Sequence, residues 1–277
     1  AIQKDLERKG LIGKAKDYLM ASGKLAVILY KEEIERAMKT PGLSGFQLLD
    51  LYDFPGQGTA LVGLLDAFWD SKGLIEAKTF RQFCSPVVPL IRFPKAIYEN
   101  NESFEAVTEV ANFGNTPLKN KNMIWQIKDS KGRQMGNGNF TCKLISIGNN
   151  QNMGNISWSL KKISKASQLT VSLKIEGTSY ENEWKIWVYP SFNATIKSDV
   201  VITQSLEEAA KELEAGKSVF LSPDWKKLKG IEGKFVPVFW SPVHFPAQAG
   251  TMGVLCNPKH PAFSMFPTEM NADWQWW

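Results

Sequence analysis

Cysteine and histidine are scarce: the 277 residues contain three Cys and two His. Three scattered cysteines are too few for a disulfide framework or a four-cysteine zinc site, and two histidines argue against a histidine-rich metal centre. No apolar run approaches the roughly 18–20 residues of a membrane-spanning helix, and the first residues show no signal-peptide pattern. We therefore expect no metal, no cofactor and no membrane span.

A strong excess of one charge is also missing. Lys and Arg number 33 against 28 Asp and Glu, and the net charge is +3, +4 and −2 over residues 1–95, 96–197 and 198–277. A dedicated nucleic-acid surface concentrates positive charge on one domain. We therefore expect no nucleic-acid partner.

Tryptophan is the residue in unusual supply, with ten copies. Trp is costly to leave exposed, so ten copies indicate either large cores or aromatic platforms for a ligand.

The chain opens directly on a helix-like segment and closes on Trp274-Gln275-Trp276-Trp277, whereas natural termini are usually polar and exposed. Both ends are therefore expected to be cuts through a longer protein of two or three domains.

Residues 1–95 are predicted to be mainly helical, with one strand. Apolar residues recur at helical spacing from Ala15 to Met38, and Pro41-Gly42 ends that pattern. The nearly continuous apolar run from Gly45 to Leu51 is typical of a strand buried on both faces. A Gly/Pro-rich loop, Asp53 to Thr59, and a helical stretch from Glu76 to Phe83 follow. This order predicts one unit of an α/β barrel or of a doubly wound sheet.

Residues 96–197 change to the alternating pattern of β-strands. Asn- and Gly-rich turns, one of them at Gly148-Asn149-Asn150, separate the alternating segments. Short strands with regular turns over about 100 residues predict an immunoglobulin-like β-sandwich, with Trp125, Trp184 and Trp187 in its core. The clearest alternating segments are 103–110, 123–128, 169–175 and 183–189.

Residues 198–277 are predicted to return to α/β structure. A strand at Val200–Ile202 precedes Ser205 and Glu208, which have the spacing of a capping box for a helix that Gly216 stops. A second strand is predicted at Ser218–Leu221, and two more at 235–240 and 252–256. This is the pattern of a small Rossmann-like (amidotransferase-like) module, although no Gly-x-Gly-x-x-Gly motif follows its first strand.

Two segments of the chain resemble a known family. The first, Tyr30–Glu35 followed by Gly45–Gly63, resembles the end of the catalytic barrel in bacterial glycoside hydrolase family 2 proteins, among them the β-galactosidase-like proteins of the Bacteroides group. The tail Leu255–Pro261, with Phe266–Glu269 and Trp274–Trp277, looks like the C-terminal module of the same proteins. The resemblance implies a (β/α)8 barrel whose last unit lies in residues 1–95, ahead of the sandwich and the α/β module.

That resemblance also carries expectations about activity. Retaining glycosidases use two carboxylates about 5–5.5 Å apart, and the family's two catalytic Glu would both precede Ala1. No catalytic residue is therefore assigned, and the chain alone is expected to be inactive. The resemblance further implies a periplasmic, cell-surface or secreted location in a bacterium.

Four residues are candidates for sugar binding. Asp50, Asp53 and Gln57 would lie at the C-terminal end of the predicted barrel strand and in its loop, where barrel active sites are built. Trp69 follows that loop and is a candidate for stacking on a sugar face. The alternative is that Asp53 and Gln57 only bind the loop's own backbone. Glu33 falls in the apolar stripe of the first helix and is expected to pair with a Lys or Arg.

Two functions remain in competition. The leading hypothesis is the C-terminal part of a glycoside hydrolase that acts on β-linked sugars. The alternative is a non-catalytic carbohydrate-binding or scaffolding module. In both cases the expected partners are carbohydrate and the remainder of the same polypeptide. Barrel faces that lack their neighbouring units would expose apolar surface, so association into oligomers is also expected.

Overall fold

The computed structural model describes residues 2–54, 61–191, 198–230, 233–234, 250–251 and 253–277. The chain forms two compact units, one of Ala1–Ser191 with Lys234–Trp277 and one of Phe192–Gly233. None of the helices in the described ranges combines the length and the apolar character needed to cross a bilayer.

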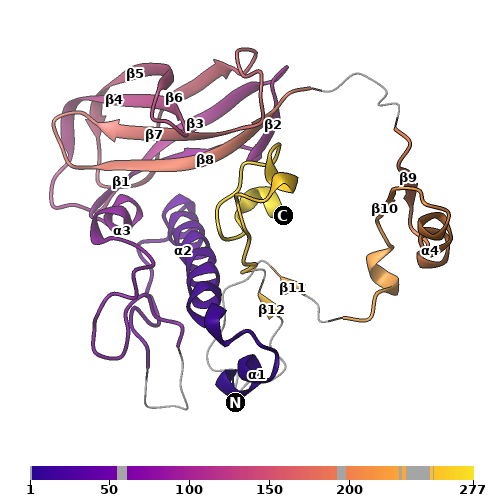
Figure 1. Ribbon diagram of the computed structural model, residues 1–277. Coiled ribbons are helices and arrows are strands. Elements are labelled where there is room, and N and C mark those ends of the chain that lie inside the picture. The colour runs from indigo at the N-terminus through magenta and orange to yellow at the C-terminus, as the bar shows by residue number, and fades with distance from the viewer. Residues whose placement is uncertain (1, 55–60, 192–197, 231–232, 235–249, 252) are drawn as a thin grey trace. The chain divides into compact units, whose positions relative to one another are not determined.

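The larger unit is built on a β-sandwich (Figure 1). One sheet has the strand order β1-β3-β6 and the other the order β2-β8-β7-β4-β5. Neighbouring strands are antiparallel except for β2, which runs parallel to β8. The strands are β1 (Val87–Arg92), β2 (Ile97–Glu99), β3 (Ser103–Asn112), β4 (Leu118–Asp129), β5 (Gln134–Ile145), β6 (Gly148–Ser159), β7 (Ser167–Ile175) and β8 (Glu181–Tyr189).

The predicted sandwich is therefore confirmed, and its core follows from the alternation of the strands. Each strand sends every second side chain into a shared apolar cluster that both sheets build. Trp125 and Trp184 are each 8% exposed and belong to this cluster, so their prediction as core residues is confirmed. Trp187 is buried too, at 1% exposed, but outside the cluster, against the C-terminal segment. The predicted turn at Gly148–Asn150 is wrong, since these residues begin β6.

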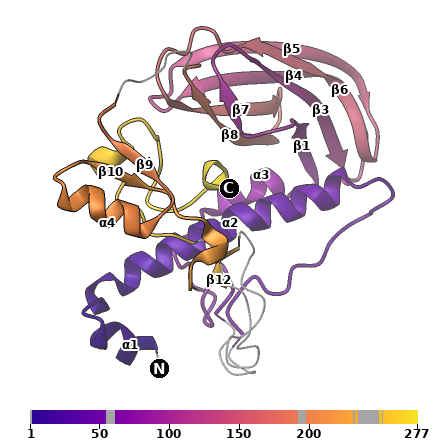
Figure 2. The same ribbon diagram turned by 90° about the vertical axis from the view of Figure 1, so that its right-hand side faces the viewer.

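Two helices pack against β1, the edge strand of the three-stranded sheet (Figures 1 and 2). Helix α2 (Ala15–Lys39) ends just before Pro41-Gly42, as predicted, and α3 is Ala77–Phe83. Strand β1 is consequently buried on both sides: Val87 and Ile91 face the sandwich core, whereas Val88 and Leu90 pack against residues of α2 and α3. This second apolar cluster joins the helices to the sandwich.

The prediction of a barrel remnant is wrong, and with it the predicted fold class. The structure consists mainly of β-sheet with few helices, and the run Gly45–Leu51 forms no strand. Phe46 and Leu49 are 41% and 65% exposed. A strand of a parallel sheet needs hydrogen-bonded neighbours on its edges, and the nearest pairing here is an isolated bridge between Tyr52 and Leu65. Helices α2 and α3 pack on the sandwich instead.

The smaller unit contains the predicted strand–helix–strand order. Strands β9 (Val201–Thr203) and β10 (Val219–Leu221) are parallel and flank α4 (Leu206–Glu214). Ser205 caps the helix by accepting a hydrogen bond from the Glu208 backbone N–H at 3.2 Å, and Gly216 follows it with a φ of 77°. The sheet has two strands, so it is much smaller than a Rossmann sheet.

The remaining elements are short. Of the two further strands predicted for the C-terminal region, residues 235–240 lie outside the described residues, and Leu255 makes an isolated bridge to Asn271. The other elements are α1 (Ile2–Arg8), β11 (Gly233–Lys234), β12 (Gly250–Thr251) and the 3-10 helices η1 (Ile12–Lys14), η2 (Trp225–Lys227), η3 (Pro261–Phe263) and η4 (Trp274–Trp276).

Candidate ligand-binding site

The residues predicted to bind sugar lie in and beside the loop that follows α2. Asp53 is 5% exposed, and its Oδ1 accepts hydrogen bonds from the Gly63 N–H at 3.0 Å and from Lys72 Nζ at 2.6 Å. The carboxylate therefore holds the loop to itself, as the alternative interpretation expected.

The other three predicted residues are not gathered around it. Asp50 is half-buried in an irregular stretch, and Gln57 lies outside the described residues. Trp69 is 60% exposed and stacks on Tyr52, with ring centroids 4.6 Å apart. Their role in sugar binding stays a prediction.

A cavity of about 230 Å³ lies elsewhere, between α2, α3, β8 and the C-terminal segment. Three tryptophans line it, namely Trp184 and Trp187 from β8 and Trp274 from η4. Seven of its polar side chains are ionisable, five carboxylates and two lysines. These side chains are Glu32, Glu35, Glu183, Glu269, Asp273, Lys31 and Lys185.

Glu35 holds α2 against β8 from beneath this cavity. Its side chain is 1% exposed, yet both carboxylate oxygens have donors. Oε1 accepts from Asn182 Nδ2 at 2.9 Å and from Lys31 Nζ, while Oε2 accepts from Trp184 Nε1 at 2.9 Å and from Lys39 Nζ at 3.1 Å. A buried carboxylate is stable only with such compensation.

The charges of this cluster shift one another's pKa. Burial alone would raise the pKa of Glu35, but the ammonium groups of Lys31 and Lys39 outweigh it, and the pKa is held below its ordinary value. Burial lowers the pKa of Lys31, although the Glu35 carboxylate opposes that shift. The Lys31 ammonium also lies 5.0 Å from the ring of Trp184, a distance at which a cation is attracted to the ring face.

The tryptophan rings are fixed in the cavity wall by their indole N–H groups. Trp184 donates to Glu35, as described above, and Trp187 Nε1 donates to the Pro267 carbonyl oxygen at 3.2 Å. Trp274 is half-buried and packs against Trp277 with ring centroids 5.7 Å apart. The cavity therefore has preorganised aromatic walls.

Asn271 supplies an unusual polar group to the same cavity. The residue is 3% exposed, and its Nδ2 donates to the Ala272 carbonyl oxygen at 2.9 Å. Its Oδ1 is buried and has no donor among the described residues. A buried acceptor without a donor costs about 1–3 kcal/mol, and four other side-chain atoms of the described residues are buried in the same way.

The C-terminal segment is tied to β8 by contacts along its length. Lys185 pairs with Glu269, and Tyr189 donates from its hydroxyl to Gln275 Oε1 at 2.8 Å. Trp276 packs edge-on against Phe266, with ring centroids 5.1 Å apart. The aromatic C-terminal residues therefore bring Asn271, Asp273 and Trp274 to the cavity.

Burial raises the pKa of Asp273 to about 6, although the backbone N–H of Gln275 and the nearby Lys185 ammonium oppose the shift. Because the native state then binds a proton that the unfolded chain releases at about pH 4, this group stabilises the fold fully below that pH and loses its contribution as the pH rises through 6. We therefore expect the difference in melting temperature, that of Asp273→Asn minus that of the native chain, to rise from pH 4 to pH 7. Thermal unfolding at both pH values checks this, and a constant difference would contradict it.

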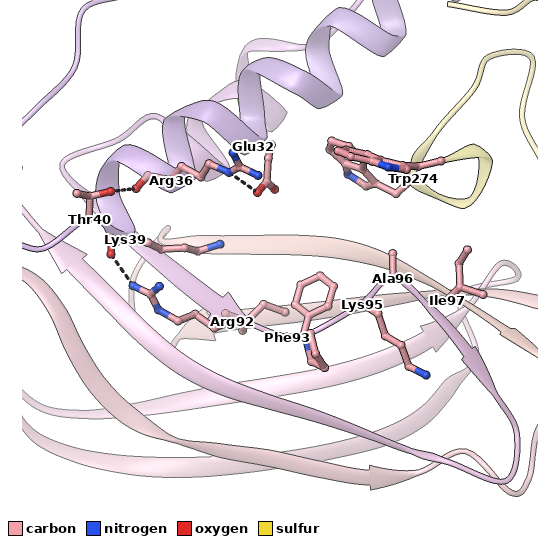
Figure 3. A pocket seen from close by; sticks show the side chains of 13 residues that line it. Glu32, Arg36, Lys39, Thr40, Arg92, Phe93, Lys95, Ala96, Ile97 and Trp274 are labelled. Carbon is pink, nitrogen blue, oxygen red and sulfur yellow. Dashed lines mark hydrogen bonds and ion pairs between the residues drawn. The ribbon is translucent and has the colours of Figure 1, made fainter. Parts of the chain in front are cut away.

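A second, broader hollow of about 890 Å³ adjoins the cavity (Figure 3). Both are lined by Glu32, Phe93 and Trp274. The rest of the broader hollow is formed by the end of α2 and by the β1–β2 connection, and four cations line it: Arg36, Lys39, Arg92 and Lys95.

Sequence reasoning missed the buried carboxylate of α2. Glu33, which was expected to be paired within the apolar stripe, is exposed, whereas Glu35 is buried. A signal for Glu35 was present, since Lys31 and Lys39 lie four residues on either side of it, the spacing of paired charges on a helix. No group of three or more His, Cys, Asp or Glu that could hold a metal ion occurs in the described ranges.

Comparisons with known proteins identify domains without an assigned function. A model described as "Domain of unknown function (DUF8488)" matches residues 102–190, and "Domain of unknown function (DUF8487)" matches residues 200–277. The first coincides with most of the sandwich, and the second contains the strand–helix–strand unit and the C-terminal segment. No curated protein matches the chain at a significant level.

Three solved structures that resemble the chain overlap with less than half of its length. The CARDB domain of a Pyrococcus furiosus protein, in complex with di-metal ions, has 12% identity and a TM-score of 0.28 over 38% of this chain and 94% of that one. A cycloisomaltooligosaccharide glucanotransferase of Paenibacillus, complexed with cycloisomaltoheptaose, has 15% identity and a TM-score of 0.29 over 46% of this chain and 18% of that one.

A β-glucuronidase from glycoside hydrolase family 2 has 14% identity and a TM-score of 0.26 over 37% of this chain and 11% of that one. At these TM-scores the overlaps carry no argument about ligand or activity. The function must be inferred from the site.

Proposed function

We propose that this chain is a non-catalytic carbohydrate-binding part of a bacterial glycan-degrading protein, and that the cavity between α2, β8 and the C-terminal segment holds one sugar ring. The observation that carries the proposal is a cavity whose wall combines three tryptophans with carboxylate, amide and ammonium side chains. The remainder of the polypeptide and a periplasmic, cell-surface or secreted location belong to the same proposal.

The chemistry of the lining matches the two kinds of surface on a sugar. The C–H face of a pyranose ring is apolar and packs on flat aromatic rings, while its hydroxyl groups both donate and accept hydrogen bonds. Trp274, which is half-buried, supplies aromatic surface that a ring can contact, while Trp184 and Trp187, 8% and 1% exposed, close the wall. Asn271 lines the same cavity with its amide group. Pockets for drug-sized ligands measure roughly 300–1,000 Å³, so the smaller cavity of about 230 Å³ suits a single ring.

Binding is favoured over catalysis because the most buried carboxylate is already committed. Both oxygens of Glu35 are engaged by donors of the protein itself. In that state the group offers neither a free proton nor a free lone pair for general acid or nucleophilic work. Its role is to orient Trp184 and to hold α2 in place.

Isothermal titration calorimetry of the 277-residue chain with neutral and acidic oligosaccharides tests the proposal, together with a hydrolysis assay on nitrophenyl glycosides. We expect saturable binding without hydrolysis. If no sugar of the panel binds, the proposal fails. Turnover that is lost in Asp273→Asn would replace it with an enzymatic function.

Asn271→Leu separates ligand binding from stability. Leucine has the branched shape of asparagine, although its side chain is larger, and it removes the buried acceptor that has no donor. We expect the free energy of unfolding to fall by about 1–3 kcal/mol, the usual cost of overpacking a buried site, while sugar affinity falls at least about tenfold, or about 1.4 kcal/mol. Chemical denaturation and calorimetry measure the two effects. A variant that binds sugar normally would exclude Asn271 from the site.

A further inference from the structure

The cavity and the broader hollow beside it form a continuous surface that a chain of sugars could follow. Trp274 lines both, and so do Glu32 and Phe93. Figure 3 shows Trp274 opposite the β1–β2 connection, with Arg36 and Glu32 from α2 on the same side of the hollow as Lys39. Trp274 also packs on Trp277, which is 75% exposed. A ring held in the cavity would therefore have its neighbour beside the Trp274–Trp277 pair.

The charge of the lining reverses between the two spaces. The cavity is lined by five carboxylates and two lysines. The hollow is lined by four cations and one carboxylate, Glu32. A ligand that occupies both would thus meet mainly acceptors with its first ring and mainly donors with the next.

Two cations of the hollow pair with acidic side chains that are themselves buried. Lys39 pairs with Glu35, whose side chain is 1% exposed, and Arg92 pairs with Glu109, whose side chain is 10% exposed. Arg92 is itself 43% exposed. Lys39 is 14% exposed, and Arg92 also donates to the Lys39 carbonyl oxygen, so these two cations are largely engaged by the protein itself.

Arg36 and Lys95 are the more accessible cations. Their side chains are 66% and 47% exposed, and each has one ion pair, with Glu32 at 3.3 Å and Glu102 at 2.5 Å. Such exposed pairs contribute little to stability, so their partners can be exchanged for a ligand's anionic group. An anion that accepts hydrogen bonds from Arg or Lys forms the stronger, charge-assisted kind.

Resting on the proposed function, we propose that the hollow is a second subsite that selects an acidic sugar. The unit next to the ring in the cavity would carry a carboxylate or a sulfate ester, which Arg36 and Lys95 bind, while its ring packs on the Trp274–Trp277 pair. The substrate class is then an acidic polysaccharide or oligosaccharide, and neutral glycans bind more weakly.

Calorimetry on the full 277-residue chain tests this inference with two sets of probes. Cellotriose, maltotriose and laminaritriose are neutral, whereas trigalacturonate, an alginate trisaccharide and a chondroitin sulfate tetrasaccharide are acidic. We expect the best acidic probe to bind at least about tenfold more tightly than the best neutral one, and its affinity to fall as NaCl is raised from 50 to 500 mM.

The variant Arg36→Gln with Lys95→Gln should reduce the preference for the best acidic probe at least about tenfold, because it removes the donors of the hollow. Lys119→Gln with Lys143→Gln is the matched control, since it removes two exposed charges from β4 and β5 outside the hollow. Circular dichroism establishes that both variants are folded.

The outcomes separate the inference from the proposed function. The second subsite is refuted, while carbohydrate binding stands, if neutral and acidic probes bind the native chain equally. It is also refuted if the variant Arg36→Gln with Lys95→Gln still prefers the acidic probe as the native chain does. If no probe of either kind binds the native chain, the proposed function fails and the second subsite with it.

Discussion

Replacing Glu35 with alanine is expected to lower the free energy of unfolding by about 3–5 kcal/mol, the usual cost of breaking a buried ion pair from one side. The substitution leaves the Lys31 ammonium, whose side chain is 21% exposed, without its carboxylate. It also removes acceptors from Asn182 Nδ2 and Trp184 Nε1, both of which are buried. Urea denaturation at neutral pH measures the loss.

Glu33→Ala is the matched control, because Glu33 is exposed on the same helix. Exposed substitutions away from such features usually stay within about 0.5 kcal/mol. A double variant, Lys31→Met with Glu35→Leu, removes both charges and should be less destabilised than Glu35→Ala. If Glu35→Ala and Glu33→Ala are equally stable, the cluster does not anchor α2 to β8 as we describe.

Trp274→Ala is expected to weaken sugar binding by about 2–4 kcal/mol, or roughly 30- to 1,000-fold, which is the range of a binding hot spot. Trp274 lines both the cavity and the hollow, so its removal takes aromatic surface from both proposed subsites at once. Calorimetry with the best probe from the panel above measures the change in affinity.

Two further variants make this result interpretable. Trp225→Ala removes a tryptophan that is 72% exposed in the smaller unit and should leave affinity unchanged. Trp274→Phe keeps a flat ring and should retain part of the affinity. If the alanine variant does not fold, the affinity of Trp274→Phe is measured in its place. Native affinity in a folded Trp274→Ala protein would disprove the proposed site.

Regular periodicity was sufficient to predict several elements. Helix α2 was predicted from its apolar spacing and from Pro41-Gly42, and four strands of the sandwich from strict alternation. Strands β5 and β6 were missed because they are rich in Asn and Gly, residues that are depleted in strands. Both strands form because their neighbours in the sheets supply the pairing.

The run Gly45–Leu51 shows where local pattern misleads. A short apolar run is consistent with a buried strand, but periodicity alone cannot show that a partner exists. The same run begins the segment Gly45–Gly63, on which the resemblance to glycoside hydrolase family 2 mainly rested, so the error passed into the expected barrel. In the structure β1 is the strand buried on both faces, because the sandwich lies on one side of it and α2 with α3 on the other.

The sequence by itself determined the helix, the alternating strands and the capped helix of the smaller unit, because hydrophobic period and capping act between residues close in the chain. Only the tertiary structure decided which polar groups meet. Glu35 and Asn182 are 147 residues apart in sequence, and the cavity adds Asn271 and Trp274 from the far end of the chain. Burial and pairing of a charge depend on what packs across from it, and no local pattern contains that information.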